Sequence, residues 1–412
     1  MNTEVAMVRL RRLADRVLAV GFCLALAAPA IGSFVTDAEQ AITTVERRQA
    51  AAFPKLETRN RWGLALPRKQ GLTAFPKGFE AWFDDHIGLR RPLIQAYQLA
   101  KVYGLTVESR NVAGDNQALV TVGRDGWLFL TGGVIDDFRR TAAFRPEELA
   151  AWKTCFARRR EWAASRGIEF VAIAAPTAQS IYPEYMPRNI KRADRPSRLD
   201  ELVAAMRDVP DFVLIDPRPA LTVRRAEYPT YLKTDGYWND FGALLAYEQL
   251  VDRLSAANRP MPLVTLADFE VCIEEVVDQG NLAKLLNSPV ACRESWLTLV
   301  PRTSRQAQTE AVGTTSDGRT ITRTTCPKAP GGKVVVLHDS FFKRLAPFVS
   351  EQFREVYYIP GLGFPAEEIE RIAPDVVIQQ FVESKLVSPA PANPASLSGD
   401  VVTAAGAGAT RR

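Results

Sequence analysis

From about residue 145 onwards, short apolar runs alternate with amphipathic segments. The apolar runs have the length and continuous hydrophobicity of buried strands, and they span 168–176, 211–216, 333–340, 355–359 and 375–380. The amphipathic segments have the period of helices, and they span 146–167, 198–208, 239–258, 341–353 and 366–373. Buried strands that alternate with helices predict a doubly wound α/β fold, in which helices cover both faces of a mostly parallel sheet.

The pattern outside this region divides the chain into four parts. They are a signal-anchor or signal peptide (1–35), an N-terminal cap (36–144), the α/β domain (145–387) and a tail (388–412). The cap contains an amphipathic helix over 75–104 and a hairpin over 118–130, which turns at Arg124-Asp125-Gly126. The tail is rich in Pro, Ala, Ser and Gly, a composition that predicts disorder.

Within the α/β domain, the alternation lapses over 287–333. This stretch is rich in Thr, Arg and Gly and predicts an insertion loop with one possible hairpin at Asp317-Gly318.

The N-terminus predicts export. Four arginines between residues 9 and 16 precede an uncharged run, 17–35, which is just long enough to cross about 30 Å of hydrocarbon as a helix. The arginines would stay in the cytoplasm, so the rest of the chain would face the periplasm from the inner membrane. Cleavage after the small residues 27–30 is the alternative, and it would release a periplasmic protein.

Charge and cysteine content narrow the function classes further. The net charge of +5 is small for 412 residues and the arginines are scattered, which argues against nucleic acid as a partner. Cys155, Cys272, Cys292 and Cys326 lack CxxC spacing, so we expect one or two disulfides, with isolated buried thiols as the alternative. No nucleotide or metal motif occurs in the sequence, so we expect no cofactor.

Two segments could carry chemistry. Ser340 ends a predicted strand and begins a predicted helix, where backbone N–H groups and the helix dipole can stabilise an oxyanion. A simple N-cap role for Ser340 is the alternative. Asp235, Tyr237 and Asn239 gather just before another helix, where Asp235 could be a turn residue and Asn239 an N-cap.

In this order and spacing, the motifs of the chain resemble those of the SGNH-hydrolase-like alginate O-acetyltransferases of the AlgX/AlgJ type. The matching motifs are PKGFEAWFDDHIGLRRPLI, VGRDGWLFL, AAPTAQSIYPEYMP, YLKTDGYWNDFGALLAY, GNLAKLL, VVVLHDSF and PDVVIQQFVES. The resemblance implies an SGNH-hydrolase-like fold with permuted motif order. It also implies that Asp235 and a histidine supply acid and base, and that Ser340 is the acyl nucleophile.

The chain departs from the family at the histidine, because that position holds Tyr237. Imidazole titrates near neutrality, whereas a free tyrosine has a pKa of about 10 and mostly donates hydrogen bonds at pH 7. Loss of the histidine from a serine hydrolase costs on the order of 10⁶ in kcat. Of the two histidines in the chain, His338 lies about 6.6 Å along the strand from Ser340, and His86 belongs to the N-terminal helix.

Two functions therefore stay open. The first is an O-acetyltransferase or acetylesterase in exopolysaccharide biosynthesis, with Ser340, Asp235 and Tyr237 as its site, an exported polysaccharide as acceptor and an acyl-donating membrane protein as partner. In that enzyme, Asp235 alone would assist Ser340, or Tyr237 would ionise more readily than a free tyrosine. The second is a catalytically degenerate scaffold or glycan-binding protein of the export machinery. An exported α/β protein of unrelated role is the third, since fold alone does not fix function.

Overall fold

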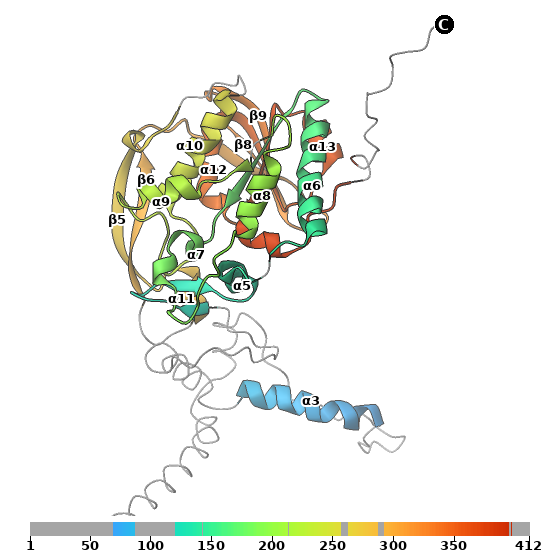
Figure 1. Ribbon diagram of the computed structural model, residues 1–412, viewed down its shortest axis with the longest axis vertical. Helices are drawn as coiled ribbons and strands as arrows, with labels where there is room; N and C mark the ends of the chain where they lie inside the picture. Colours follow the sequence, from blue (N-terminus) through green and yellow to red (C-terminus); the bar gives the residue numbers. More distant parts are fainter. Residues whose placement is uncertain are drawn as a thin grey trace, which may run out of the picture. The chain divides into compact units, whose positions relative to one another are not determined.

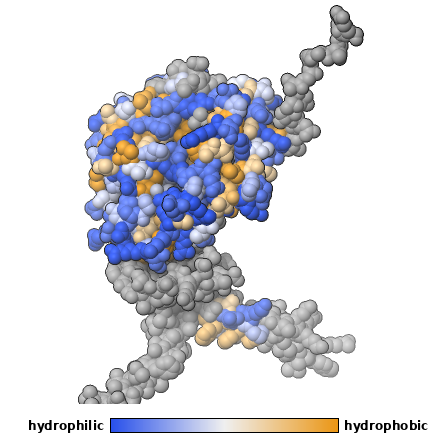
Figure 2. Space-filling model, in the orientation of Figure 1, coloured by the Kyte–Doolittle hydropathy of each residue, from blue (hydrophilic) through white to orange (hydrophobic). Residues whose placement is uncertain are grey.

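The computed structural model describes residues 69–86, 120–141, 143–212, 214–256, 263–286, 292–394 and 397. They fall into two compact units, of which one contains helix α3 (Lys69–His86) and the other contains all remaining described residues. The side chains described for α3 are apolar on one side and polar on the other (Figure 2), and they include the exposed rings of Phe79 and Phe83. The predicted helix over 75–104 is thus confirmed up to His86.

The predicted export segment, 17–35, and the rest of the predicted cap helix, 87–104, lie outside the described residues. Among the helices that are described, none combines the length and the hydrophobicity needed to cross a bilayer.

A seven-stranded mixed sheet forms the centre of the larger unit (Figure 1). Its five parallel strands are, in spatial order, β4 (Leu214–Ile215), β3 (Glu169–Ala175), β11 (Val376–Val382), β9 (Gly331–His338) and β10 (Phe353–Pro360). Two antiparallel strands, β8 (Thr320–Thr325) and β7 (Gln308–Thr314), extend the sheet beyond β10. The prediction of a parallel α/β core is confirmed, and the complete sheet is mixed.

Helices cover both faces of the sheet (Figure 1). One face packs against α6 (Pro146–Ala164), α8 (Arg198–Met206) and α13 (Ala366–Ile372), and the other against α10 (Asp240–Ala256) and α12 (Phe342–Ser350). In β9, Val334 and Val336 face α10 and α12, while Val335 and Leu337 face the other layer. All four are fully buried, and burial of such a side chain stabilises the fold by roughly 1.5–3 kcal/mol.

The predicted hairpin of the cap is confirmed as β1 (Val120–Val122) and β2 (Leu128–Leu130). Asp125 and Gly126 have φ values of 55° and 81°, a left-handed conformation that Asp and Gly tolerate best. Trp127 and Phe129 are buried in the same apolar cluster as the α10 face of the sheet. The hairpin is therefore part of the α/β core.

The predicted insertion loop over 287–333 is wrong where the structure describes that stretch. β6 (Arg293–Pro301) pairs with β5 (Phe269–Val277), and β7 and β8 form a hairpin on the main sheet. The predicted turn at Asp317-Gly318 joins β7 to β8, with Gly318 at φ 81°. β7 is exposed along its length and β8 is mostly half-buried, and β8 is rich in Thr, whose branched side chain suits a strand without making it apolar.

The predicted disordered tail begins as ordered chain. The 3-10 turn η4 (Glu383–Val387) leads into residues that pack on α6: Asn393 Oδ1 accepts from Arg159 Nε at 2.8 Å, and Asn393 Nδ2 donates to the Cys155 carbonyl. Leu397 is buried as well. The composition of the tail could not predict this order, because the order comes from a tertiary contact. The buried Arg159 needs hydrogen-bond acceptors, and Asn393 supplies one of them.

The predicted disulfides are also wrong. Cys155, Cys272 and Cys326 are free thiols, so no two of the four predicted cysteines can be joined. Cys155 and Cys326 are buried, and burial raises the pKa of both thiols.

A buried carboxyl on α5 (Gly133–Arg139) makes stability depend on pH. Burial, reinforced by the charge of Glu383, raises the pKa of Asp137 from 3.8 to about 7. Among the described residues, its Oδ1 has no hydrogen-bond partner. The folded chain therefore holds a proton here that the unfolded chain has already released, so this contribution is full below about pH 4 and is lost as the pH rises through 7.

Replacing Asp137→Asn should flatten the pH dependence of unfolding. We expect the wild-type melting temperature to fall between pH 5 and pH 8 by more than that of the variant, because the variant has no proton to lose. Calorimetric melting at several pH values measures this. The exposed neighbour Asp136→Asn is the matched control, and identical profiles for Asp137→Asn and wild type would contradict the assignment.

Candidate active site

Ser340 lies in the turn between β9 and α12, at the carboxyl end of a parallel strand, where sites form in sheets of this kind. Asp339 fixes the turn: its carboxylate accepts from the N–H groups of Phe341 (2.9 Å) and Val382 (2.6 Å) and from Gln380 Nε2 (2.9 Å). Ser340 itself is exposed. Phe341 is the N-cap residue of α12, so the alternative in which Ser340 merely caps the helix is wrong.

The second candidate segment is a tight loop before α10. Tyr231 and Trp238 pair as an antiparallel bridge, and Asn239 N–H donates to the Thr230 carbonyl. Asn239 Oδ1 accepts from Gly242 N–H at 3.0 Å, which confirms the N-cap role considered for it. The loop therefore presents Tyr237 and Trp238 in a fixed orientation.

The loop and the Ser340 turn meet in three contacts. The Tyr237 hydroxyl donates to Ser340 Oγ at 2.8 Å. The buried indole of Trp238 donates to the Phe341 carbonyl at 3.0 Å, and the ring of Tyr237 packs edge-on against that of Phe341 at 4.8 Å. The fold thus brings the two predicted segments together and places Tyr237 directly against Ser340.

Asp235 lies beside this pair and holds the loop. Its carboxylate accepts from the N–H groups of Tyr237 and Asn281, each at 3.3 Å. Asn281 begins α11 (Asn281–Leu286), and its side-chain oxygen accepts from Gly236 N–H. Burial raises the pKa of Asp235, and the three backbone donors that surround it, including Gly236, oppose that rise. Within the described part of the chain, Asp235 bonds to the backbone of Tyr237 and not to its phenol.

His338 does not supply a base beside Ser340. His338 Nδ1 lies 2.8 Å from the Asp339 carbonyl oxygen, and its ring packs near Phe342 and Tyr358. The structure shows no hydrogen bond from His338 to Ser340, as the spacing along the strand predicts. His86 ends α3 in the other unit.

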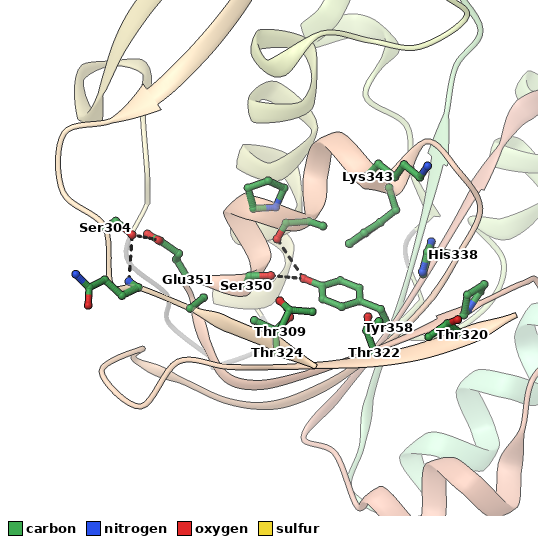
Figure 3. A pocket seen from close by; sticks show the side chains of 16 residues that line it. Ser304, Thr309, Thr320, Thr322, Thr324, His338, Lys343, Ser350, Glu351 and Tyr358 are labelled. Carbon is green, nitrogen blue, oxygen red and sulfur yellow. Dashed lines mark hydrogen bonds between the residues drawn. The ribbon is translucent and has the colours of Figure 1, made fainter. Parts of the chain in front are cut away.

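A groove of about 530 Å³ runs between α12 and the extended sheet (Figure 3), and Ser340 is not among the residues that line it. We call it the threonine groove after the hydroxyls that line it, which belong to Thr309, Thr320, Thr322 and Thr324. His338 and Lys343 lie at one end, and Ser304 and Glu351 at the other. Its volume falls within the range of small-molecule sites, roughly 300–1,000 Å³.

Sequence reasoning missed this groove. The spacing of two between Thr320, Thr322 and Thr324 predicts one polar face of a strand, and that signal could have found it. Among the described residues, no group of three or more His, Cys, Asp or Glu side chains could hold a metal ion.

Comparison with known proteins places the chain in a family. A family model described as the SGNH hydrolase-like domain of the acetyltransferase AlgX matches residues 120–329, more than half of the 412-residue chain. The chain belongs to the SGNH hydrolase-like AlgX acetyltransferase family. The match includes Asp235 and Tyr237 and ends before Ser340. No protein with curated annotation matches the sequence.

The solved structure of PatB1 agrees with the fold of this AlgX-family chain. PatB1 of Bacillus cereus aligns with a TM-score of 0.52 at 14% identity, over 66% of this chain and 97% of PatB1. The O-acetyltransferase domain of Pseudomonas putida AlgJ aligns with a TM-score of 0.42 at 17% identity, over 68% and 97% of the two chains. At these identities the PatB1 likeness bears on the fold alone.

The close packing of α11 against the loop yields a test of how the site is held. A Cβ on Gly280 would lie 2.0 Å from the Thr234 carbonyl oxygen, which also accepts from Leu282 and Ala283 N–H. Gly280→Ala must therefore push α11 away from Thr234 and Asp235. We expect a loss of roughly 1–3 kcal/mol in unfolding free energy.

The matched control is Gly363→Ala, because a Cβ at Gly363 meets nothing within 4 Å. Its unfolding free energy should change by no more than about 0.5 kcal/mol. Urea titration of both variants measures the difference. Equal stability of Gly280→Ala and Gly363→Ala would show that the contact between α11 and the loop is not tight.

Proposed function

We propose that this AlgX-family protein transfers an acetyl group through Ser340 to a hydroxyl of an exported polysaccharide of the alginate type. The observation that carries the proposal is the bond between Tyr237 Oη and Ser340 Oγ, 2.8 Å long, at the exposed carboxyl edge of the sheet. It joins a nucleophile to an acid–base group at the position where the family has its histidine. The threonine groove, to which His338 and Lys343 also contribute, offers hydroxyl groups suited to a sugar.

Two features support the chemistry at Ser340. Its backbone N–H bonds to none of the described residues and precedes the N-terminus of α12, so it can donate to an oxyanion. The Tyr237 hydroxyl is hydrogen-bonded to Ser340 Oγ, which makes it the group placed to exchange a proton with the serine.

The cellular setting is part of the same proposal. The charge pattern of the first 35 residues supports an inner-membrane anchor with the α/β domain in the periplasm. An acyl-donating membrane protein would then supply the acetyl group, and the exported polysaccharide would pass the exposed edge of the sheet.

A scaffold or glycan-binding protein is the second candidate, and Tyr237 itself favours it. A neutral phenol that donates to Ser340 Oγ occupies a lone pair of the nucleophile and takes no proton from it. In that case the site would bind the polysaccharide without acetylating it.

Acetylation of Ser340 distinguishes the two candidates. We expect the full-length protein, incubated with 4-nitrophenyl acetate at pH 8, to gain one acetyl group on Ser340, detected by mass spectrometry of its peptides. Ser340→Ala should gain none. Tyr237→Phe should react at least tenfold more slowly, which is about 1.4 kcal/mol of transition-state stabilisation. Tyr237→His should react faster than wild type, since imidazole is the better base at this pH.

Ser350→Ala is the matched control, because Ser350 on the same helix also bonds to a tyrosine hydroxyl, that of Tyr358, at 2.7 Å. It should react as wild type does. If wild type and Tyr237→His both stay unmodified while the protein binds alginate-type oligosaccharide, the scaffold is correct and acyl transfer is not.

A further inference from the structure

One end of the threonine groove lies at the carboxyl edge of the parallel strands. Pro360, the last residue of β10, pairs with His338 of β9, and the register between β10 and β8 puts Thr320 on its other side. This end of the groove is therefore two strand spacings wide, about 10 Å between backbones. Ser340 follows His338 by two residues, which keeps their Cα atoms within about 7.6 Å of each other. The groove thus ends next to the turn that carries Ser340, although Ser340 does not line it.

The sheet side of the groove is a row of hydroxyl groups. Thr320, Thr322 and Thr324 point to one face of β8, and the row is about 13 Å long. Thr324 shares a hydrogen bond of 2.8 Å with Thr309. The side chains of Thr320 and Thr322 form no hydrogen bond with another described residue. Because a hydroxyl has one donor and two acceptor sites, this row can both donate to a ligand and accept from it.

The opposite side of the groove, which α12 provides, is largely apolar. It presents the side chains of Phe342, Ala346 and Pro347. A sugar ring has C–H groups on its faces and hydroxyl groups along its edges, so it can pack against α12 and bond to the threonine row at once. Ligand sites commonly combine an apolar lining with a few placed polar groups in this way.

The two ends of the groove differ in charge. Lys343 is exposed at the end where His338 lies (Figure 3), and its ammonium bonds to no other residue in the described part of the chain. At the far end, the carboxylate of Glu351 accepts from Ser304 Oγ at 2.5 Å. A negatively charged ligand group is therefore favoured at the Lys343 end, the end beside the Ser340 turn.

A second cation lies near the Lys343 end. A Cβ on Gly361 would be 2.8 Å from the Arg319 guanidinium, and Gly361 N–H donates to the His338 carbonyl at 2.7 Å. Arg319 also pairs with Asp317 at the surface. Burial lowers the pKa of His338, and the charges of Arg319 and Lys343 add to that shift. Both cations therefore act on the same end of the groove.

His338 supplies a hydrogen-bond acceptor at this end. Its Nδ1 lies 2.8 Å from the Asp339 carbonyl oxygen, and that oxygen can only accept, so Nδ1 carries the hydrogen. Nε2 of the neutral ring is then an acceptor, and none of the described residues bonds to it. A sugar hydroxyl can donate to this nitrogen.

We propose that the threonine groove binds a stretch of acidic polysaccharide, with a sugar carboxylate at Lys343 and sugar hydroxyls along the threonine row and at His338 Nε2. The groove is then a binding subsite separate from the candidate active site. A strand longer than the groove continues past His338 to the edge that carries Ser340, so the groove holds the acceptor while a neighbouring sugar unit reacts. The inference rests on the proposed polysaccharide acceptor.

Binding of two hexasaccharides to the full-length protein tests the groove. Isothermal titration calorimetry compares a mannuronate hexasaccharide with uncharged mannohexaose. Wild type should bind the mannuronate probe on the order of tenfold more tightly, because only that probe offers a carboxylate to Lys343. Lys343→Met should remove this preference, and Lys343→Arg should keep most of it. Thr322→Val replaces a hydroxyl by a methyl group and should weaken binding of both probes roughly three- to tenfold.

Two control variants lie outside the groove. Thr325→Val changes a half-buried threonine of the same strand whose side chain points to the other face of β8. Lys328→Met removes an exposed lysine from the loop between β8 and β9. Both should bind the two probes as wild type does.

Equal dissociation constants for wild type, Thr322→Val and Lys343→Met would overturn the groove, as would failure of wild type to bind either probe. If the groove is overturned while 4-nitrophenyl acetate acetylates Ser340 of wild type, acyl transfer stands. If the groove variants weaken binding while Ser340 of wild type is never acetylated, the groove is correct and the scaffold candidate holds.

Discussion

The site of this protein depends on one junction, where the loop before α10 meets the turn after β9. Two hydrogen bonds cross it, from the Tyr237 phenol to Ser340 Oγ and from the buried Trp238 indole to the Phe341 carbonyl. The indole bond is shielded from water, so leaving either partner unsatisfied would be costly, roughly 1–3 kcal/mol. The buried bond of Trp238 thereby fixes the position of the exposed bond between Tyr237 and Ser340.

The junction gives Tyr237, which the resemblance aligns with a histidine, a fixed place against Ser340. A phenol reaches Ser340 Oγ with good hydrogen-bond geometry and packs its ring edge-on against Phe341. What changes is the chemistry, because the phenol must first lose its own proton before it can accept one. Asp235 binds the backbone N–H groups of Tyr237 and Asn281.

The parallel α/β core could be predicted from the sequence, because its strands are continuously apolar and amphipathic helices follow them directly. The pairing of Asp235, Tyr237 and Ser340 was predicted from the resemblance to the AlgX family, and the structure places the three in one site. Sequence reasoning failed where burial is partial. β8, which contains Thr320, Thr322 and Thr324, has no apolar signature. Asn393 packs because Arg159 needs an acceptor that only the folded chain reveals. The export segment stays a prediction.

The central claim is that Tyr237 controls the reactivity of Ser340, and labelling with phenylmethylsulfonyl fluoride tests it most directly. The reagent attacks an activated serine without needing a glycan, a donor or a partner protein. The account predicts that Ser340 of the full-length wild type is sulfonylated, and that the rate rises with pH and falls at least tenfold in Tyr237→Phe. Equal labelling rates at Ser340 in wild type and Tyr237→Phe at every pH would contradict it.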